Sequence, residues 1–502
     1  MREAVTESGA VRGISCGWPG VTVYYGIPYA APPVGELRWR PPQMPISWEG
    51  IRDSAHPGAI CPQPSPSEKG IKEFYPVSEA MSEDCLYLNI WTPAHSAQEK
   101  LPVIFWIHGG AFITGYGHSS HFDGEAFARQ GVILVTINYR LNIFGWLVHP
   151  ELSAESGKGV SGNYGLMDQI FALNWVKRNI SAFGGDPERI TLAGQSAGAM
   201  SVNCLLHSSA VQGSFQSAIM QSGGGLMGFS DMSHYRTASQ AETLADLEAE
   251  LHVKTIAQAR ALDAGELLNR WMNVGFGKSR LQTCPVIDGY LLERPLEETA
   301  WAGAYAPVPT LLGYTAQENV PTMPTPDVFR ETMRKDMGVR AEEFFQLCPL
   351  ETKAEWKKFM FSNCTELLRS SCEAWARLTE RHGTPPAYVY TLTRQLPGDD
   401  AGAFHGSCLT YVFKTFLRGW RPWIGQDLEI SSAMNTYWAN FAKYGTPNGD
   451  NGLNEKQLPY WIPYTSETEL TMEFGNELIG MVRQPENARV SFRSQAILEP
   501  TH

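Results

Sequence analysis

The chain lacks long apolar segments and has no excess of basic side chains. No run approaches the roughly 18 apolar residues of a membrane span, and residues 1–7 lack the apolar stretch of a signal peptide. Its 40 basic and 52 acidic side chains give a net charge of −12, the wrong sign for binding a phosphate backbone or an anionic membrane. We expect no nucleic-acid partner, no membrane span and, for the chain as written, a cytoplasmic protein. Secretion stays open if a preceding segment has been removed.

Cysteine is sparse, with nine residues, an odd number, scattered over 502 positions. This usage does not fit the disulfide framework of a small secreted domain, so most of the cysteines should be buried thiols. Cys61 and Cys85 are a candidate disulfide, because they bracket a segment rich in Pro, Ser and Glu that would form a surface loop. Closing that loop would stabilise the fold by about 3.5 kcal/mol. The sequence leaves the oxidation state of this pair open.

Material for a folded core is abundant. The chain is 43% hydrophobic and 18% charged, which is the composition of a globular protein and excludes disorder. A length of 502 residues exceeds the usual size of one domain, but α/β folds often carry such lengths as one catalytic body with insertions. We expect one domain that spans residues 1–502.

Short apolar runs bounded by turn residues recur along the chain. They lie at residues 101–107, 131–138, 189–193, 217–221, 310–313 and 387–392. Such runs are typical of strands in a sheet buried on both faces. Between the second and third runs, Leu166, Ile170 and Leu173 begin a series spaced by three and four residues, which predicts an amphipathic helix. This alternation predicts a large, mainly parallel sheet flanked by helices, an α/β fold.

Two stretches break the alternation, at about residues 225–283 and 320–384. Both favour helix and are rich in charge and methionine, so we expect insertions that cover the top of the sheet like a cap. Near the C-terminus, Ile430, Met434 and Phe441 fall on one helical face. We expect this helix to pack on the core.

The strongest chemical motif is Gly194-Gln195-Ser196-Ala197-Gly198. It follows the run at 189–193 and precedes residues that favour a helix, as in a nucleophile elbow. A serine on a sharp strand-to-helix turn needs small neighbours, because its backbone is strained while its hydroxyl stays exposed. The five-residue pattern also occurs by chance in long chains. Its position directly after a buried strand favours Ser196 as a catalytic nucleophile.

Acyl transfer also needs donors for the oxyanion, each of which lowers the barrier by about 3 to 4 kcal/mol. Gly109 and Gly110 directly follow the strand at 101–107, where consecutive glycines let the backbone N–H groups turn inward. The N–H of Ala197 would be the third donor. The competing interpretation is a glycine turn without function. We expect the neighbouring His108 to be structural.

In an α/β hydrolase the nucleophile, acid and histidine follow one another in that order, which excludes histidines before Ser196. Of the later ones, His405 lies in a glycine-containing loop after the run at 387–392, whereas His382 precedes that run and should lie on the surface. For the acid we favour Glu318, just past the run at 310–313. Asp288 is the rival, although it precedes a glycine and fits a turn better.

With these residues placed, the chain resembles the type-B carboxylesterases of the α/β-hydrolase superfamily, a group that includes cholinesterases and the non-catalytic neuroligins. The resemblance covers nearly the whole length. The segments that carry it are 25–30, 32–35, 83–89, 183–187, 437–441 and 445–448.

The resemblance implies the triad of Ser196, Glu318 and His405, an oxyanion hole of Gly109, Gly110 and Ala197, and no cofactor or metal. It also implies two structural ion pairs, Arg38 with Glu83 and Arg140 with Asp168, because charges inside apolar segments need partners. Many relatives close the Cys61–Cys85 loop with a disulfide.

Several positions depart from the family pattern. Gln195 replaces the glutamate that cholinesterases carry beside the nucleophile, and the 61–85 loop has no tryptophan to stack on a quaternary ammonium, so choline esters are poor candidates. Cys408 stands where many relatives have an acidic residue, and Gly224 where a serine is often found. The last two changes concern the surroundings of the triad.

We therefore expect a serine carboxylesterase that hydrolyses small-molecule esters through an acyl-enzyme, as a monomer or small homo-oligomer. One alternative is an amidase or carbamate hydrolase that uses the same triad. Another is a non-catalytic, adhesion-type homologue, which is disfavoured because such relatives commonly lose the nucleophile. Acyl and alcohol preference cannot be read from the sequence, because the expected pocket walls lie in the insertions.

Overall fold

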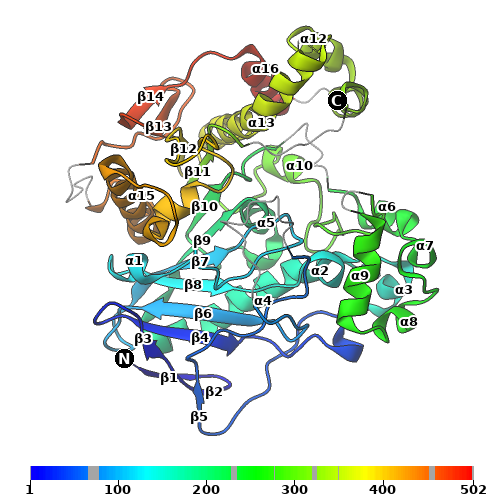
Figure 1. Ribbon diagram of the computed structural model, residues 1–502, viewed down its shortest axis with the longest axis vertical. Coiled ribbons are helices and arrows are strands. Elements are labelled where there is room, and N and C mark those ends of the chain that lie inside the picture. Colours follow the sequence, from blue (N-terminus) through cyan, green and yellow to red (C-terminus); the bar gives the residue numbers. More distant parts are fainter. Residues whose placement is uncertain are drawn as a thin grey trace. The chain divides into compact units, whose positions relative to one another are not determined.

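The computed structural model describes residues 2–65, 79–227, 235–275, 278–318, 325–348, 350–450 and 458–499. Parts of the predicted insertions and of the 61–85 loop lie outside these residues. Contacts divide the chain into two compact units (Figure 1). The first comprises Met1–Ser201, Ser208–Gln216 and Tyr235–Arg294, and the second comprises Val202–His207, Ser217–His234 and Pro295–His502. That the whole chain forms one domain stays a prediction.

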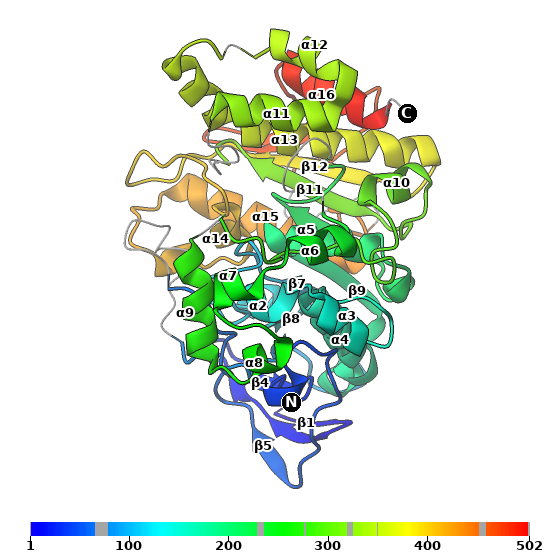
Figure 2. The same cartoon turned by 90° about the vertical axis from the view of Figure 1, so that its right-hand side faces the viewer.

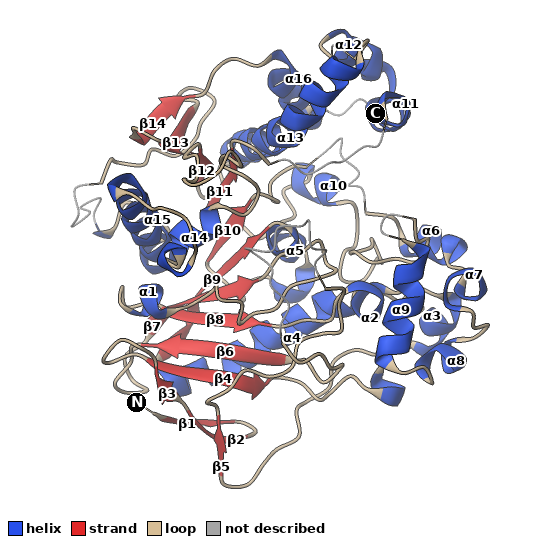
Figure 3. Ribbon diagram, in the orientation of Figure 1, coloured by secondary structure: helices blue, strands red, loops and turns tan. Residues whose placement is uncertain are grey.

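In the first unit, six strands form one continuous array in the order β9-β7-β8-β6-β4-β3 (Figure 3). They are β3 (Ile14–Ser15), β4 (Thr22–Pro28), β6 (Tyr87–Thr92), β7 (Leu101–Ile107), β8 (Ile133–Ile137) and β9 (Gly185–Gln195). β7 runs parallel to both β8 and β9, whereas β4, β6 and β8 are antiparallel to one another in turn. A separate three-stranded sheet contains β1 (Glu3–Thr6), β2 (Gly9–Arg12) and β5 (Ile51–Asp53).

The helices of the first unit include the one predicted from the spacing of Leu166, Ile170 and Leu173, which is α4 (Tyr164–Asn179). The others are α1 (Glu125–Ala128), α2 (Asn142–Trp146), α3 (Pro150–Glu155), α6 (Ala238–Leu244), α7 (Leu247–Leu251), α8 (Ile256–Arg260) and α9 (Ala264–Val274), together with the start of α5 (Ala197–Leu206). The helices α6 to α9 come from the first predicted insertion and gather on the side of this unit that is drawn at the right of Figure 1 and faces the viewer in Figure 2. Local capping starts them: Thr237 and Gln240 form a capping box on α6, and Asp263 caps α9.

The second unit has five strands in the order β14-β13-β12-β11-β10. They are β10 (Ser217–Gln221), β11 (Thr310–Thr315), β12 (Ala387–Leu392), β13 (Leu470–Phe474) and β14 (Ile479–Arg483). The first four are parallel, and β14 is antiparallel to β13. The helices are α10 (Leu296–Trp301), α11 (Pro326–Met337), α12 (Ala341–Gln346), α13 (Lys353–His382), α14 (Cys408–Val412), α15 (Gly425–Tyr444) and α16 (Ala488–Leu498).

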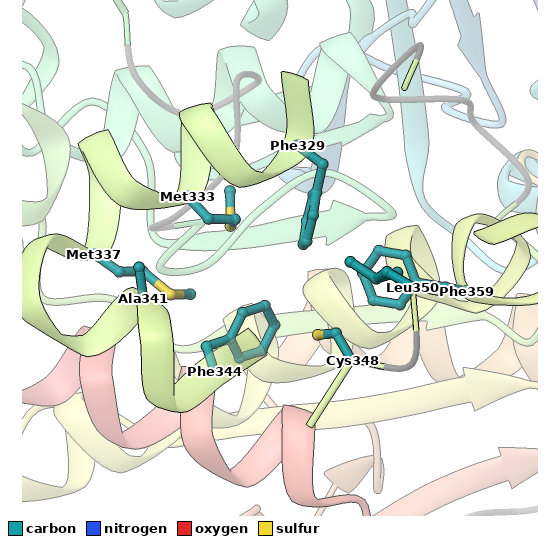
Figure 4. Packing of buried hydrophobic residues seen from close by; sticks show 8 residues of the cluster. All are labelled: Phe329, Met333, Met337, Ala341, Phe344, Cys348, Leu350 and Phe359. Atoms are coloured by element: carbon teal, nitrogen blue, oxygen red, sulfur yellow. The ribbon is translucent and has the colours of Figure 1, made fainter. Parts of the chain in front are cut away.

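The second predicted insertion builds a small hydrophobic core of its own. Side chains of α11, of α12, of the segment after α12 and of the start of α13 converge there, as Figure 4 shows for Phe329, Met333, Met337, Ala341, Phe344, Cys348, Leu350 and Phe359. The rings of Phe329 and Phe359 meet edge to face, with centroids 4.9 Å apart. Phe492 of α16 packs against the same cluster. Apolar packing therefore fixes this insertion on the second unit.

Two buried ion pairs tie distant segments of the first unit together. Asp168 of α4 is fully buried and accepts hydrogen bonds from the Nε and Nη2 of Arg140, both at 2.8 Å. Arg38 and Glu83 form a second bidentate pair, with both N–O distances 2.6 Å. Arg38 also donates through Nη1 to three backbone carbonyls at residues 259, 260 and 262. Such pairs are costly to break, because the remaining charge would stay buried without its partner.

His207, near the end of α5, is a buried imidazole of the second unit. Its Nδ1 donates to the carbonyl oxygen of Asn203 at 2.8 Å, and its ring packs against Tyr305 and Trp375. Burial lowers the pKa of His207 to about 4, against an ordinary value of 6.5. The folded protein therefore keeps this ring neutral at pH values where the unfolded chain binds a proton.

Among the described residues, no helix is long and apolar enough to cross a membrane.

We predict that His207 makes stability depend on pH. As pH falls from about 6.5 towards 4, the unfolded chain takes up a proton that the folded protein excludes, and about 3 kcal/mol of stability is lost through this residue. A His207→Phe variant keeps a ring between Tyr305 and Trp375, so its unfolding free energy should fall less steeply over this range. Urea unfolding at several pH values measures the slope. The exposed His56 provides the control, and equal slopes for His207→Phe, His56→Phe and wild type would contradict the prediction.

Candidate active site

Ser196 lies at the sharp turn between β9 and α5. Its φ is +56°, in the left-handed region that a residue other than glycine rarely adopts, and its side chain is half-buried. A Cβ at Gly198 would collide with the carbonyl oxygen of Ile107, and a Cβ at Gly194 would collide with the backbone of Gly198. There is therefore no space for a side chain at either glycine of the motif, as expected for a nucleophile elbow.

The loop after β7 lies directly against this turn. A Cβ at Gly109 would be 2.6 Å from the carbonyl oxygen of Gln195 and 3.0 Å from the Cβ of Ser196. The carbonyl of Gly110 accepts hydrogen bonds from the N–H groups of Ile113 and Thr114, at 3.0 and 2.9 Å, which fixes the loop. Outside regular helices and strands, the described residues contain no hydrogen bond from the N–H of Gly109, Gly110 or Ala197. Gly109 lies against Ser196, and Ala197 follows it directly in the chain.

His108 supports the loop from below. It is buried, its Nδ1 donates to the carbonyl oxygen of Gly109 at 2.7 Å, and its ring stacks on Tyr139 at 4.5 Å. The Tyr139 hydroxyl donates to the carbonyl oxygen of His108 at 2.9 Å. Burial lowers the pKa of His108 to about 4, so the ring stays neutral near pH 7. These contacts are those of a structural residue, which matches the expectation from the sequence.

In the second unit, the loops after β11 and β12 bring Glu318 and His405 together. Gln317 pairs with Phe404 in an isolated parallel bridge, and the N–H of Gln317 donates to the carbonyl oxygen of Ala403 at 3.0 Å. Because Glu318 and His405 each follow a bridge residue by one position, their side chains are adjacent. The Nδ1 of His405 hydrogen-bonds to Oε2 of Glu318.

Glu318 is completely buried and held at both ends. Its Oε1 accepts the N–H of Thr315 at 2.6 Å, and its own N–H donates to Oγ1 of Thr365 at 3.0 Å. The side chain of His405 is 17% exposed. A carboxylate on Nδ1 selects the tautomer in which Nε2 carries the basic lone pair. The pair can therefore act as an oriented general base.

The two rival residues have other partners. Oδ1 of Asp288 accepts the N–H groups of residues 290, 291 and 292 at 2.8 to 3.0 Å, and Oδ2 accepts Nδ2 of Asn163 at 2.9 Å. Asp288 is thus a turn aspartate in the first unit. His382 is exposed at the end of α13, with its Nδ1 3.2 Å from the Tyr305 hydroxyl.

The two departures near the acid have a structural basis in the second unit. Cys408 is fully buried, accepts Nε2 of Gln221 at 3.2 Å, and has its pKa raised to about 12 by burial, so it is a neutral thiol. Gln221 in turn accepts Nε1 of Trp438 at 3.1 Å. At Gly224, a Cβ would be 2.5 Å from both Cβ and Sδ of Met220. No pattern in the sequence indicates this Gln221–Cys408–Trp438 network, because its members are far apart along the chain.

Cys61 and Cys85 are both buried free thiols in the structure. A side-chain hydrogen bond with Cys61, together with burial, raises the pKa of Cys85 well above its ordinary value. Cys61 also accepts the N–H of Leu141 through Sγ at 3.3 Å. The two sulfurs are neighbours, and their oxidation to a disulfide stays a prediction.

In the part of the chain that the structure describes, no group of three His, Cys, Asp or Glu residues could hold a metal ion.

Known proteins resemble the chain along its whole length. The model of the carboxylesterase family matches residues 2–493. Fumonisin B1 esterase of Sphingopyxis macrogoltabida is 36% identical over 94% of this chain and 86% of the relative, and para-nitrobenzyl esterase of Bacillus subtilis (strain 168) is 33% identical over 94% of both. A solved structure of a PNB esterase is 30% identical, covers 100% of both chains and has a TM-score of 0.82. The likeness confirms the predicted α/β-hydrolase fold.

We predict that Gly198→Ala lowers activity by moving the elbow. The added methyl group has no space beside the carbonyl oxygen of Ile107, so the turn that carries Ser196 must shift. Misplacement of a reacting group by about 1 Å costs on the order of 100-fold in rate, and overpacking costs about 1–3 kcal/mol of stability. Steady-state kcat/KM and thermal unfolding measure the two effects. Gly425→Ala is the matched control, since a Cβ there meets nothing within 4 Å, and similar losses in both variants would contradict the prediction.

Proposed function

The chain belongs to the carboxylesterase family, and we propose that Ser196, His405 and Glu318 carry out its hydrolysis of carboxylic esters. The observation that carries this proposal is the hydrogen bond between Nδ1 of His405 and the buried carboxylate of Glu318. Ser196 belongs to the first unit, and the other two residues belong to the second. The proposal therefore requires both units to act as one catalytic domain.

In the first step, Oγ of Ser196 attacks the ester carbonyl carbon while Nε2 of His405 takes the hydroxyl proton. Glu318 keeps Nδ1 protonated and stabilises the imidazolium that forms. A fully buried carboxylate suits this task, because its interaction with the developing positive charge is screened little by water. The strained backbone of Ser196 places this residue on the sharp turn between β9 and α5.

The attack gives a tetrahedral intermediate whose carbonyl oxygen carries a negative charge. We propose that the N–H groups of Gly109, Gly110 and Ala197 donate to this oxygen. The close approach of Gly109 to Ser196 supports this role, because the donors must lie within about 3 Å of the new oxyanion. Backbone donors held by β7 and by the start of α5 need no rearrangement during the reaction.

Collapse of the intermediate breaks the bond to the alkoxy oxygen. The imidazolium of His405 gives its proton to that oxygen, the alcohol leaves, and Ser196 remains acylated. A water molecule then attacks the acyl carbon, with His405 again taking the proton, and the acid is released as Ser196 regains its hydrogen. We propose a small-molecule carboxylic ester as the substrate. Choline esters are disfavoured by Gln195, which replaces the glutamate of the cholinesterases.

We predict that Ser196→Ala lowers turnover of a p-nitrophenyl ester by about a millionfold, since the acyl-enzyme can no longer form. Steady-state hydrolysis measures the loss, and an unchanged thermal unfolding temperature shows that the fold is intact. A fluorophosphonate probe should label the wild-type protein at Ser196 and leave the variant unlabelled. Retained turnover in Ser196→Ala would remove Ser196 from the mechanism.

Labelling also tests whether the two units act together. His405→Ala should slow labelling of Ser196 strongly, because the serine loses its base. His382→Ala, which removes an exposed histidine of the same unit, should label at the wild-type rate. Equal labelling rates in both variants would mean that His405 does not serve Ser196.

We predict that Glu318→Gln lowers kcat by about 10⁴-fold while the protein stays folded. The amide fills the same space but cannot stabilise an imidazolium, and it can hold the wrong tautomer of His405. The kcat and the KM for a p-nitrophenyl ester are measured together, and KM should change little because Glu318 contacts no substrate. Asp288→Asn is the matched carboxylate-to-amide control, and a loss of kcat there as large as in Glu318→Gln would favour the rival acid.

A further inference from the structure

The first unit contains a cavity of about 360 Å³ whose lining residues include none of the proposed catalytic or oxyanion residues. Residues of α4 line part of it, among them Met167, Ile170 and Phe171, which are half-buried. Trp39 and Tyr290 form part of its wall. The volume falls within the roughly 300–1,000 Å³ of small-molecule sites, and the lining is mostly apolar with a few polar groups, as in such sites.

The walls of the cavity are fixed by contacts outside it. Nε1 of Trp39 donates to the carbonyl oxygen of Ile143 at 2.8 Å, and the carbonyl of Arg40 accepts Nη1 of Arg140 at 2.8 Å. On the other side, Asp288 accepts the N–H groups of Tyr290 and Leu291. The cavity is therefore preformed, and a ligand would lose little affinity to ordering the protein.

The charged side chains that line the cavity have a net positive charge. Glu155 is the acidic side chain of the lining, and it is already bound by both terminal nitrogens of Arg260, at 2.9 and 2.7 Å, and by Arg40 at 3.4 Å. Lys158 stands at the rim with its ammonium 5.0 Å from the centre of the Tyr290 ring. Among the described residues, no carboxylate lies within ion-pair distance of Lys158. An incoming anion would thus meet an uncommitted lysine.

We propose that this cavity binds an amphiphilic monocarboxylate, with its carboxylate at Lys158 and its apolar chain along α4. A neutral alkane chain would contact the apolar lining but would not interact with the charge of Lys158. A cationic amphiphile would be repelled by Lys158 and Arg40. The ligand class is the one that ester hydrolysis releases. The site itself does not depend on the proposed roles of Ser196, His405 and Glu318.

Isothermal titration calorimetry of the full chain with octanoate tests the proposal, with octan-1-ol and octylammonium as probes of matched length. Octanoate should bind at one site, and the two other probes should bind at least tenfold more weakly. Lys158→Ala should weaken octanoate binding about five- to tenfold, the effect of one charge-assisted hydrogen bond at an exposed rim, and Lys158→Arg should restore it. Lys254→Ala, which removes an exposed lysine elsewhere in the unit, should bind as wild type.

A second variant separates the cavity from every other apolar site. Ala210 lines the cavity and is exposed, so Ala210→Trp should fill the opening without disturbing the core, and it should abolish binding. Ester turnover should be unchanged in Lys158→Ala and Ala210→Trp, and circular dichroism verifies their fold. Octanoate binding that survives both substitutions would place the acid elsewhere, including the catalytic centre, and would overturn the proposal. Absence of binding to wild type would overturn it equally, whatever the outcome for Ser196→Ala.

Discussion

The contact on which the first unit's chemistry depends is the close approach of the elbow to the end of β7. β7 and β9 are parallel neighbours, and Gly198 lies so near the carbonyl oxygen of Ile107 that no side chain fits between them. The same packing presses Gly109 against Ser196. The proposed nucleophile and its proposed backbone donors are thus held together by hydrogen bonds and van der Waals contact within a rigid sheet, rather than by mobile side chains.

In the second unit, a contact between two loops brings Glu318 and His405 together. A single parallel bridge, Gln317 with Phe404, joins the loops that follow β11 and β12, and the next residue on each side is Glu318 or His405. The carboxylate of Glu318 is held in one orientation, because it is buried and accepts a hydrogen bond from the N–H of Thr315. The surrounding thiol of Cys408 stays neutral, so it adds no charge that would compete with the imidazolium.

Much of the fold could be predicted because its central strands are uniformly apolar. The runs at 101–107, 217–221 and 387–392 coincide with β7, β10 and β12, since strands buried on both faces leave a continuous hydrophobic signal. β4 and β13 were not predicted. β4 mixes tyrosines with a glycine and a proline, and β13 is short and half-exposed at one end, so neither gives a clear period. Helical packing in the insertion at 320–384 has no signature in the sequence beyond its tendency to form helix.

The sequence by itself determined the residue types and their order: a serine between glycines, an acid after one strand and a histidine after the next. Those features can be read locally, because a sharp turn requires small residues beside the serine and because the acid and the histidine each follow a strand in the sequence. Only the tertiary structure decided which groups touch. The partners of Asp288 and His108, namely Asn163 and Tyr139, come from segments far along the chain, so no local pattern identifies them. The cavity beside α4 arose in the same way, because volume and charge balance depend on packing between segments that no local pattern encodes.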